Sequence, residues 1–165
     1  MIRNSHDLLI GKWGAQIKGR TFPCSVGREG IGKKKYEGDG LTPEGAWNLI
    51  SVMYRKDRLN LNTDKNIKIR DTWSDDPNDP NYNKLSKPSN QFSYERLWRS
   101  DPIYDLIGII DYNLPKPKLG RGSAIFLHVW RKPRHPTEGC IAFSLNNLKL
   151  ILGLLENKSK IIIKA

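Results

Sequence analysis

A histidine and a cysteine are the two side chains of this sequence best placed for covalent chemistry. His128 ends the apolar run 122–128, and Cys140 follows after a loop rich in proline and arginine. A cysteine nucleophile needs a base within hydrogen-bond reach and backbone N–H groups aimed at the developing oxyanion. A strand that ends in His128 and a tight turn at Gly139 and Cys140 supply both. The pair therefore indicates thiol acyl-transfer chemistry.

Two other interpretations of the cysteines compete with catalysis. The sequence has only two cysteines, too few for a disulfide framework. Cys24 lies in a short strand-like segment and is most simply a small core residue. Cys140 has the glycine Gly139 and the charged Glu138 before it rather than apolar residues. The alternatives are two inert buried thiols and a Cys24–Cys140 disulfide in a non-catalytic fold.

Length and composition indicate a globular chain with a basic surface. We expect residues 1–165 to form a single domain, because this length provides one sizeable core. No window of about 18 apolar residues exists, so no membrane span is expected, and the first residues lack the apolar segment of a signal peptide. The formal net charge of +11 suits anionic surroundings such as a wall polymer or nucleic acid.

The basic residues do not form a nucleic-acid motif. They are scattered, and the densest run is Lys33-Lys34-Lys35. We therefore expect a solvated basic surface and no nucleic-acid partner. The spacing of histidines, cysteines and carboxylates also fits no metal site, so neither a catalytic metal nor another cofactor is predicted.

The pattern of apolar residues predicts a mainly β fold. Short strands are expected at 7–10, 15–18, 21–26, 46–54, 67–70, 105–111, 123–130, 141–143 and 160–164. Ser144 is a good N-cap, and leucines and isoleucines follow it at helical spacing up to Leu155. One helix beside many strands favours a β-sandwich of mixed sheets, with the helix directly after the cysteine.

Residues 71–102 form the unusual part of the chain. Prolines recur among aspartates and asparagines at 75–83, which excludes a ladder or a helix interior there. We predict a long inserted loop region, and ordered loops of this length are usually functional. Aromatic residues would attach it to the body; they are Trp73, Tyr82, Phe92, Tyr94 and Trp98.

Two motifs together resemble the L,D-transpeptidase catalytic domain of the YkuD type. That family has a strand histidine, a loop and then Ser/Thr-His-Gly-Cys, matched here by His128, Thr137, Gly139 and Cys140. Its Gly-Asp-Gly-x-Thr-Pro-x-Gly turn is matched by residues 38–45. The resemblance covers most of the chain, and the insertion with its Tyr-Glu-Arg-Leu-Trp run resembles one branch of the family. Thr-Glu-Gly-Cys replaces the usual motif, with Glu138 in place of the second histidine.

The resemblance implies acyl transfer on peptidoglycan. Cys140 would attack the carbonyl of the third residue of a stem tetrapeptide and expel the terminal D-Ala. The acyl group would then pass to an amine of a second stem or of a wall-linked protein. His128 would take the thiol proton or hold it in a thiolate–imidazolium pair. The N–H groups of Gly139 and Cys140 would bind the oxyanion, and the implied location is periplasmic or otherwise extracytoplasmic.

Residues near the motif are candidates for substrate binding. Glu138 would orient His128, bind the acceptor amine or pair with Arg131 or Arg134. The two arginines would hold a substrate carboxylate through forked donors, and Thr137 belongs to the same group. Two other functions fit the sequence: an L,D-carboxypeptidase or amidase that hydrolyses wall peptides, and a non-catalytic basic module that binds wall polymer.

Overall fold

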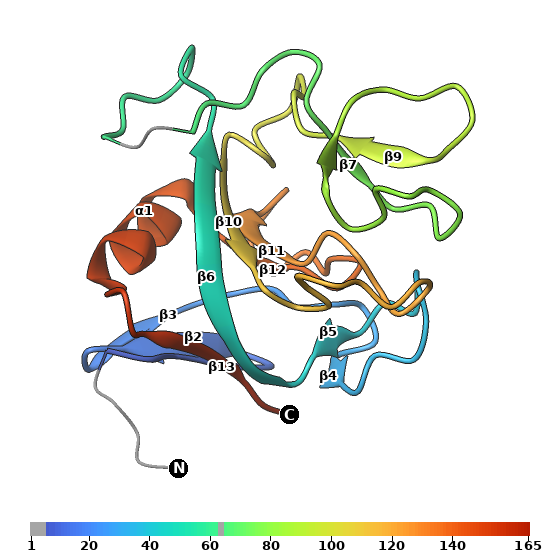
Figure 1. The fold of residues 1–165 in the computed structure, drawn as a ribbon. Coiled ribbons are helices and arrows are strands. Elements are labelled where there is room, and N and C mark those ends of the chain that lie inside the picture. Colours follow the sequence, from blue (N-terminus) through green and yellow to red (C-terminus); the bar gives the residue numbers. More distant parts are fainter. Residues whose placement is uncertain (1–5, 63–64) are drawn as a thin grey trace.

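A computed structural model describes residues 6–62 and 65–165. The strands and the helix follow one another along the chain from β1 to β13 (Figure 1). Their bounds are β1 (Leu8–Gly11), β2 (Gly14–Ile17), β3 (Arg20–Phe22), β4 (Ile31–Gly32), β5 (Thr42–Pro43), β6 (Gly45–Tyr54), β7 (Thr72–Ser74), β8 (Leu85–Ser86), β9 (Tyr94–Arg96), β10 (Leu106–Ile110), β11 (Phe126–Val129), β12 (Ile141–Phe143), α1 (Leu145–Leu154) and β13 (Lys160–Ile163).

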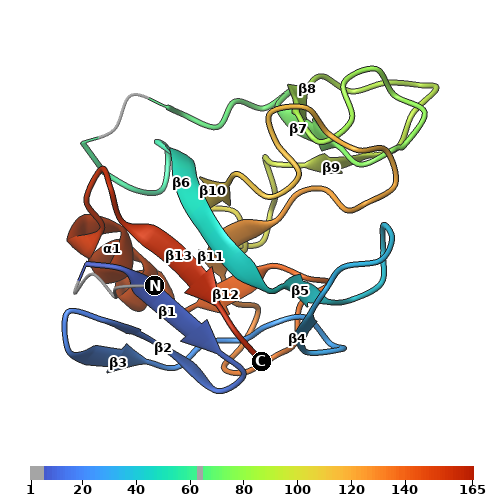
Figure 2. The same ribbon diagram turned by 60° about the horizontal axis from the view of Figure 1, so that its bottom comes forward.

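The main sheet has eight strands in the order β12-β11-β10-β6-β13-β1-β2-β3. Just beyond β3, Ser25 pairs with Ala142 of β12, the strand at the opposite end, through backbone hydrogen bonds of 2.8 and 2.9 Å. The sheet is therefore nearly closed and barrel-like, as Figure 2 shows from below. The predicted mainly β class with one helix is confirmed, whereas the sheet is not the clear sandwich that we expected.

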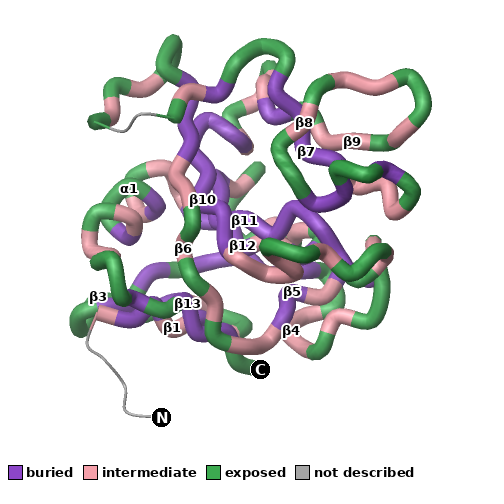
Figure 3. The backbone as a smooth tube through the Cα atoms, viewed as in Figure 1, coloured by how far each residue is buried: buried purple, intermediate pink, exposed green. Residues whose placement is uncertain are grey.

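Two hydrophobic clusters lie on the two faces of the central strands. On β11, Leu127 and Val129 pack into the larger cluster, and Phe126 packs into a smaller one. β10 and β11 are buried along their whole length, and Figure 3 shows them in the buried colour. Burial on both faces explains why these two strands are almost continuously apolar in sequence.

The predicted helix is present at its expected place. The Ser144 side chain accepts a hydrogen bond from the N–H of Asn147 (3.2 Å), and Leu148 and Ile151 are buried in the larger cluster. The cap and the apolar spacing thus act as the sequence indicated. Within the described ranges, no helix has the length and apolar character needed to cross a bilayer.

The insertion is more regular than the predicted loop. Its β7, β8 and β9 form a three-stranded antiparallel sheet, while residues 75–83 between β7 and β8 form turns. The strand expected at 67–70 is wrong: this segment contains a turn, because the Asp71 carboxylate accepts from the N–H of Lys68 at 2.8 Å. An aspartate that bonds a backbone N–H a few residues away favours a turn over a strand.

A buried asparagine joins the insertion to the main sheet. The Oδ1 atom of Asn83 accepts from the indole N–H of Trp73 (2.9 Å) and from the N–H of Ala124 (3.0 Å). Its Nδ2 group donates to the carbonyls of Tyr112 and Asn113 at 3.2 and 3.1 Å. The amide therefore makes four hydrogen bonds to groups from three segments, all in a site where Asn83 is 2% exposed.

We expect Asn83→Ala to lower the free energy of unfolding by about 3 kcal/mol or more, because the substitution leaves several buried polar groups without partners. Chemical denaturation followed by circular dichroism measures the change. Asn81→Ala is the matched control, since Asn81 is exposed and its backbone N–H, not its side chain, bonds Asp79. Equal stability of the two variants would contradict this role of Asn83.

Candidate active site

The thiol and the imidazole lie on the same face of two neighbouring strands. β11 and β12 are parallel, with His128 opposite Ala142. Cys140 precedes Ala142 by two residues, so it belongs to the same side of the sheet as His128. Consistent with this, Cys140 packs against the smaller cluster, which contains Phe126, the residue two before His128 on β11. Strand geometry thus brings the two sequence-predicted residues to one face of the sheet, on neighbouring strands.

His128 is fixed in one tautomer by its surroundings. Its Nδ1 atom lies 2.8 Å from the carbonyl oxygen of Val129, which can only accept a hydrogen bond. Nδ1 therefore carries the proton, and Nε2 is left as an acceptor. The ring of Tyr104 packs edge-on against the imidazole, with centroids 5.5 Å apart. Burial, together with the nearby charge of Arg99, lowers the pKa of His128 to about 4.

The thiol of Cys140 is held by the backbone of the segment that precedes β11. Sγ donates to the carbonyl of Ala124 at 3.0 Å and accepts from the N–H of Phe126 at 3.3 Å. Burial and the negative charge of Glu95 raise the pKa of Cys140 to about 12. The resting pair at neutral pH is therefore a neutral thiol and a neutral imidazole, rather than a thiolate–imidazolium pair.

The turn before Cys140 is closed by a threonine hydroxyl. Thr137 Oγ1 donates to the carbonyl of Cys140 (2.6 Å) and accepts from the N–H of Gly139 (3.1 Å). The hydroxyl is thus engaged in the turn, and the Gly139 N–H already has an acceptor. Gly139 has a φ of +142°, and a Cβ there would lie 2.9 Å from the carbonyl oxygen of Leu41. Only glycine fits this position without displacement.

The glycine-rich turn at 38–45 packs directly against the cysteine turn. The hydroxyl of Thr42 donates to the carbonyl of Gly139 (2.8 Å) and accepts from the N–H of Gly27 (2.8 Å). Thr42 is fully buried. The two motifs that are far apart in sequence are therefore one structural unit, joined by a hydroxyl that satisfies a donor and an acceptor at once.

A buried ion pair supports the same turn. Lys34 Nζ lies 2.6 Å from the carboxylate of Asp39, and both side chains are almost completely buried. Burial opposes ionisation of Asp39, but hydrogen bonds from Lys34 and from the N–H groups of Lys35 and Leu41 lower its pKa. Lys34 is therefore not part of the solvated surface that the sequence indicated for the run 33–35.

Glu138 has a different partner from those we expected. It is exposed and forms an ion pair with Arg28, not with Arg131 or Arg134. Arg28 also donates to the carbonyl of Gly38 (3.2 Å), so the Arg28–Glu138 pair joins the cysteine turn to the glycine-rich turn from outside.

The structure separates the two arginines of the loop between β11 and β12. Arg134 donates to the carbonyl of Trp13 (3.1 Å), at the β1–β2 turn. Arg131 is exposed, and its charge acts on Asp101. Asp101 in turn forms an ion pair with Arg99, whose guanidinium lies 5.4 Å from the centroid of the Tyr104 ring. Arg131 is thus on the side of the site that contains His128, whereas Arg134 lies at the β1–β2 turn.

A tyrosine–glutamate pair beside the thiol was not singled out from sequence. The hydroxyl of Tyr104 donates to the carboxylate of Glu95, and burial raises the pKa values of both. Glu95 lies in the Tyr-Glu-Arg-Leu-Trp run of the insertion. The sequence therefore identified the segment, but it did not indicate that the Glu95 carboxylate lies near the thiol. Only the fold shows that β9 brings this carboxylate close enough to affect Cys140.

The disulfide alternative is wrong, because both cysteines are free. Cys24 is buried in the larger cluster, with its Sγ 3.7 Å from the carbonyl oxygen of Gly11. Cys140 belongs to the opposite face of the sheet. Burial raises the pKa of Cys24 to about 11, as expected for a structural thiol.

In a Cys24→Ala protein, we expect alkylation of Cys140 by iodoacetamide to accelerate continuously from about pH 7 to about pH 10. The rate should show no plateau there, because the thiolate fraction rises about tenfold per unit below a pKa of about 12. Mass spectrometry of quenched samples measures the rate. A plateau near neutral pH would contradict the neutral resting thiol.

Replacing Glu95 by Gln in the same protein should increase the alkylation rate at a given pH, because the negative charge beside Cys140 is lost. Glu37→Gln is the matched control. Glu37 also accepts from a tyrosine, Tyr82 (2.5 Å), but has no effect on the Cys140 pKa. An equal change in both variants would contradict the assignment.

Thr42→Val should lower the free energy of unfolding by about 2 to 4 kcal/mol, because the Gly27 N–H and the Gly139 carbonyl lose their partner in a buried site. Thr42→Ser keeps the hydroxyl and should retain most of the stability. Thermal and urea unfolding measure both variants. If valine is tolerated as well as serine, the hydroxyl does not hold the turn.

Comparison with known proteins identifies a family for this chain. No match was found among curated proteins. The family model of the L,D-transpeptidase catalytic domain, YkuD, matches residues 8–163, from the first strand of the main sheet to the last. Enzymes of this family are L,D-transpeptidases, which cross-link peptidoglycan. By the extent of this match and by its fold, the chain belongs to the YkuD family of L,D-transpeptidase catalytic domains.

Proposed function

We propose that Cys140 is the nucleophile and His128 the general base of an acyl transfer between peptidoglycan stem peptides. The observation that carries this proposal is the shared face of β11 and β12, with His128 Nδ1 bonded to a carbonyl and Nε2 available as an acceptor. Residues 8–163 would act as one catalytic domain outside the cytoplasm, on a wall-bound substrate.

The first half-reaction forms a thioester. Sγ of Cys140 attacks the carbonyl carbon of the third residue of a stem tetrapeptide as its proton passes to His128 Nε2. Because both groups are neutral at rest, proton transfer accompanies attack instead of preceding it. When the tetrahedral intermediate collapses, the C–N bond breaks, and the imidazolium protonates the leaving amine of D-Ala.

The second half-reaction transfers the acyl group. An amine of a second stem or of a wall-linked protein attacks the thioester, His128 takes its proton, and Cys140 Sγ leaves and is reprotonated. For the oxyanion we propose the N–H of Cys140 as a donor, and no longer that of Gly139, which bonds Thr137. In the Thr-Glu-Gly-Cys variant, Glu138 holds the turn through Arg28 and has no catalytic role.

We assign the recognition of a substrate carboxylate to Arg131. It is exposed on the side of the site that contains Arg99, Asp101 and Tyr104. A guanidinium can bind the carboxylate of the third residue or of D-Ala through two parallel hydrogen bonds. Arg134 is not part of this assignment, since it donates to the carbonyl of Trp13.

Cys140→Ala and His128→Gln should each reduce D-Ala release from a disaccharide tetrapeptide by about a thousandfold or more, since each removes a group that acts in the transition state. Cys24→Ala, the matched control, should keep the activity. Circular dichroism checks that each variant is folded. Full turnover by a folded Cys140→Ala protein would exclude the proposal.

The same assay separates transfer from hydrolysis. Reactions run with and without an acceptor amine are analysed by mass spectrometry. Cross-linked products that form at the expense of free tripeptide support transfer. Free tripeptide that is insensitive to acceptor supports the hydrolase alternative with the same two catalytic residues.

A further inference from the structure

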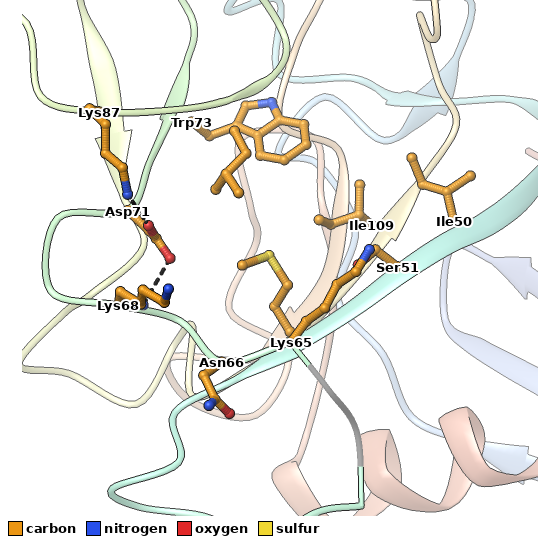
Figure 4. Close-up of a pocket in the computed structure, with 11 residues that line it drawn as sticks. Ile50, Ser51, Lys65, Asn66, Lys68, Asp71, Trp73, Lys87 and Ile109 are labelled. Atoms are coloured by element: carbon orange, nitrogen blue, oxygen red, sulfur yellow. Dashed lines mark hydrogen bonds and ion pairs between the residues drawn. The ribbon is translucent and has the colours of Figure 1, made fainter.

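A cavity lies on the same sheet face as the thiol. It has a volume of about 640 Å³ and is bounded by β6, β10 and the beginning of the insertion (Figure 4). Its apolar wall includes Met53, Trp73 and Ile109, and the half-exposed Ile50 lies at its edge. None of the residues placed in the catalytic site lines it.

The polar side of this cavity is cationic. Lys65, Lys68 and Lys87 line it with a single carboxylate, Asp71. Lys87 neutralises that carboxylate at 2.7 Å, and the N–H of Lys68 bonds it as well. Figure 4 shows the Asp71 carboxylate between these two residues. Among the described residues, the ammonium groups of Lys65 and Lys68 have no ion-pair partner.

A hydroxyl in the cavity wall also lacks a partner. The Oγ atom of Ser51 is buried and makes no hydrogen bond to any described residue. Ser51 pairs with Ile109 across β6 and β10, and both residues line the cavity (Figure 4). A buried polar atom without a partner costs free energy, which a bound acceptor or donor would recover.

A series of contacts through Trp73 and Phe126 links the cavity to the thiol. The Trp73 ring, which lines the cavity, packs edge-on against Phe126 with centroids 5.0 Å apart. The N–H of Phe126 in turn donates to Cys140 Sγ. A peptide bound in the cavity would thus lie on the same side of the sheet as the reacting thiol.

We propose that this cavity binds a carboxylate-bearing segment of a peptidoglycan stem peptide, as a subsite next to the catalytic residues. The lysines would bind the carboxylates, and the apolar wall would contact the aliphatic parts of the peptide. This inference rests on the proposed function for its ligand. A bound stem peptide would provide partners for the ammonium groups of Lys65 and Lys68 and for the Ser51 hydroxyl, and it would cover the apolar wall.

Binding of a synthetic stem tetrapeptide to the Cys140→Ala protein tests the proposal without turnover. Titration calorimetry should show that Lys65→Gln combined with Lys68→Gln weakens binding about fivefold or more, because two charge contacts are lost. A tetrapeptide with all carboxylates amidated should bind the unaltered cavity equally weakly. Lys149→Gln, an exposed lysine on α1, is the control and should have no effect.

An added negative charge gives a second, independent variant. Ile50→Glu adds a carboxylate at the cavity edge and should weaken binding, whereas Leu150→Glu on α1 should not. The two residues are matched in exposure, at 49% and 48%. Affinities that are unchanged in both the lysine pair and the Ile50 variant would overturn the proposal.

Kinetics in the protein with Cys140 intact separate this inference from the proposed function. The cavity variants should raise KM for the stem substrate while kcat changes little. Unchanged KM with normal turnover refutes the subsite but keeps the catalytic assignment. Carboxylate-dependent binding in a protein without turnover refutes the catalytic assignment but keeps the subsite.

Discussion

Two threonine hydroxyls, one of them fully buried, hold the segment on which the proposed chemistry depends. Cys140 lies just before β12, in a turn that has no ladder of its own. Thr137 closes this turn from within, and Thr42 ties Gly139 to the backbone of Gly27. Each hydroxyl both donates and accepts, so neither leaves an unsatisfied group in the interior. The glycine-rich turn places Thr42 where its hydroxyl reaches Gly139. Residue 139 must be glycine because the carbonyl oxygen of Leu41 leaves no room for a Cβ.

The electrostatics of the site differ from those of the surface. The chain has a formal charge of +11, yet the largest effects on the Cys140 pKa are burial and the negative charge of Glu95, which raise it, whereas the N–H of Phe126 and the charge of Lys34 lower it. Burial disfavours charge on both the thiol and the imidazole, so these two groups do not form a thiolate–imidazolium ion pair at rest. In the proposed reaction, the substrate would supply the conditions for proton transfer by excluding water and placing its carbonyl next to Sγ. A low reactivity toward small electrophiles is compatible with efficient acyl transfer under these conditions.

Local sequence patterns predicted the elements that carry the site but not the contacts that complete it. The apolar runs located β10, β11 and β12, and the Ser144 cap located α1, because burial and capping are local signals. The placement of His128 and Cys140 on one face also follows from strand alternation. By contrast, Glu95, Tyr104 and the buried Lys34–Asp39 pair depend on long-range packing, for which a charged residue in a loop gives no signal. The closure of the sheet was missed for the same reason, since it depends on backbone pairings between residues 25–28 and residues 137–142, which are far apart in sequence.

These pairings have a consequence for how the fold is assembled. Ser25 and Ala142 come from opposite ends of the chain, so the loop that their contact closes is among the longest in the fold. Loops of this kind carry a large entropic cost and form after local hairpins such as β1–β2. The seam adjoins the strand that follows Cys140, so the position of this thiol depends on backbone contacts between segments far apart in the sequence.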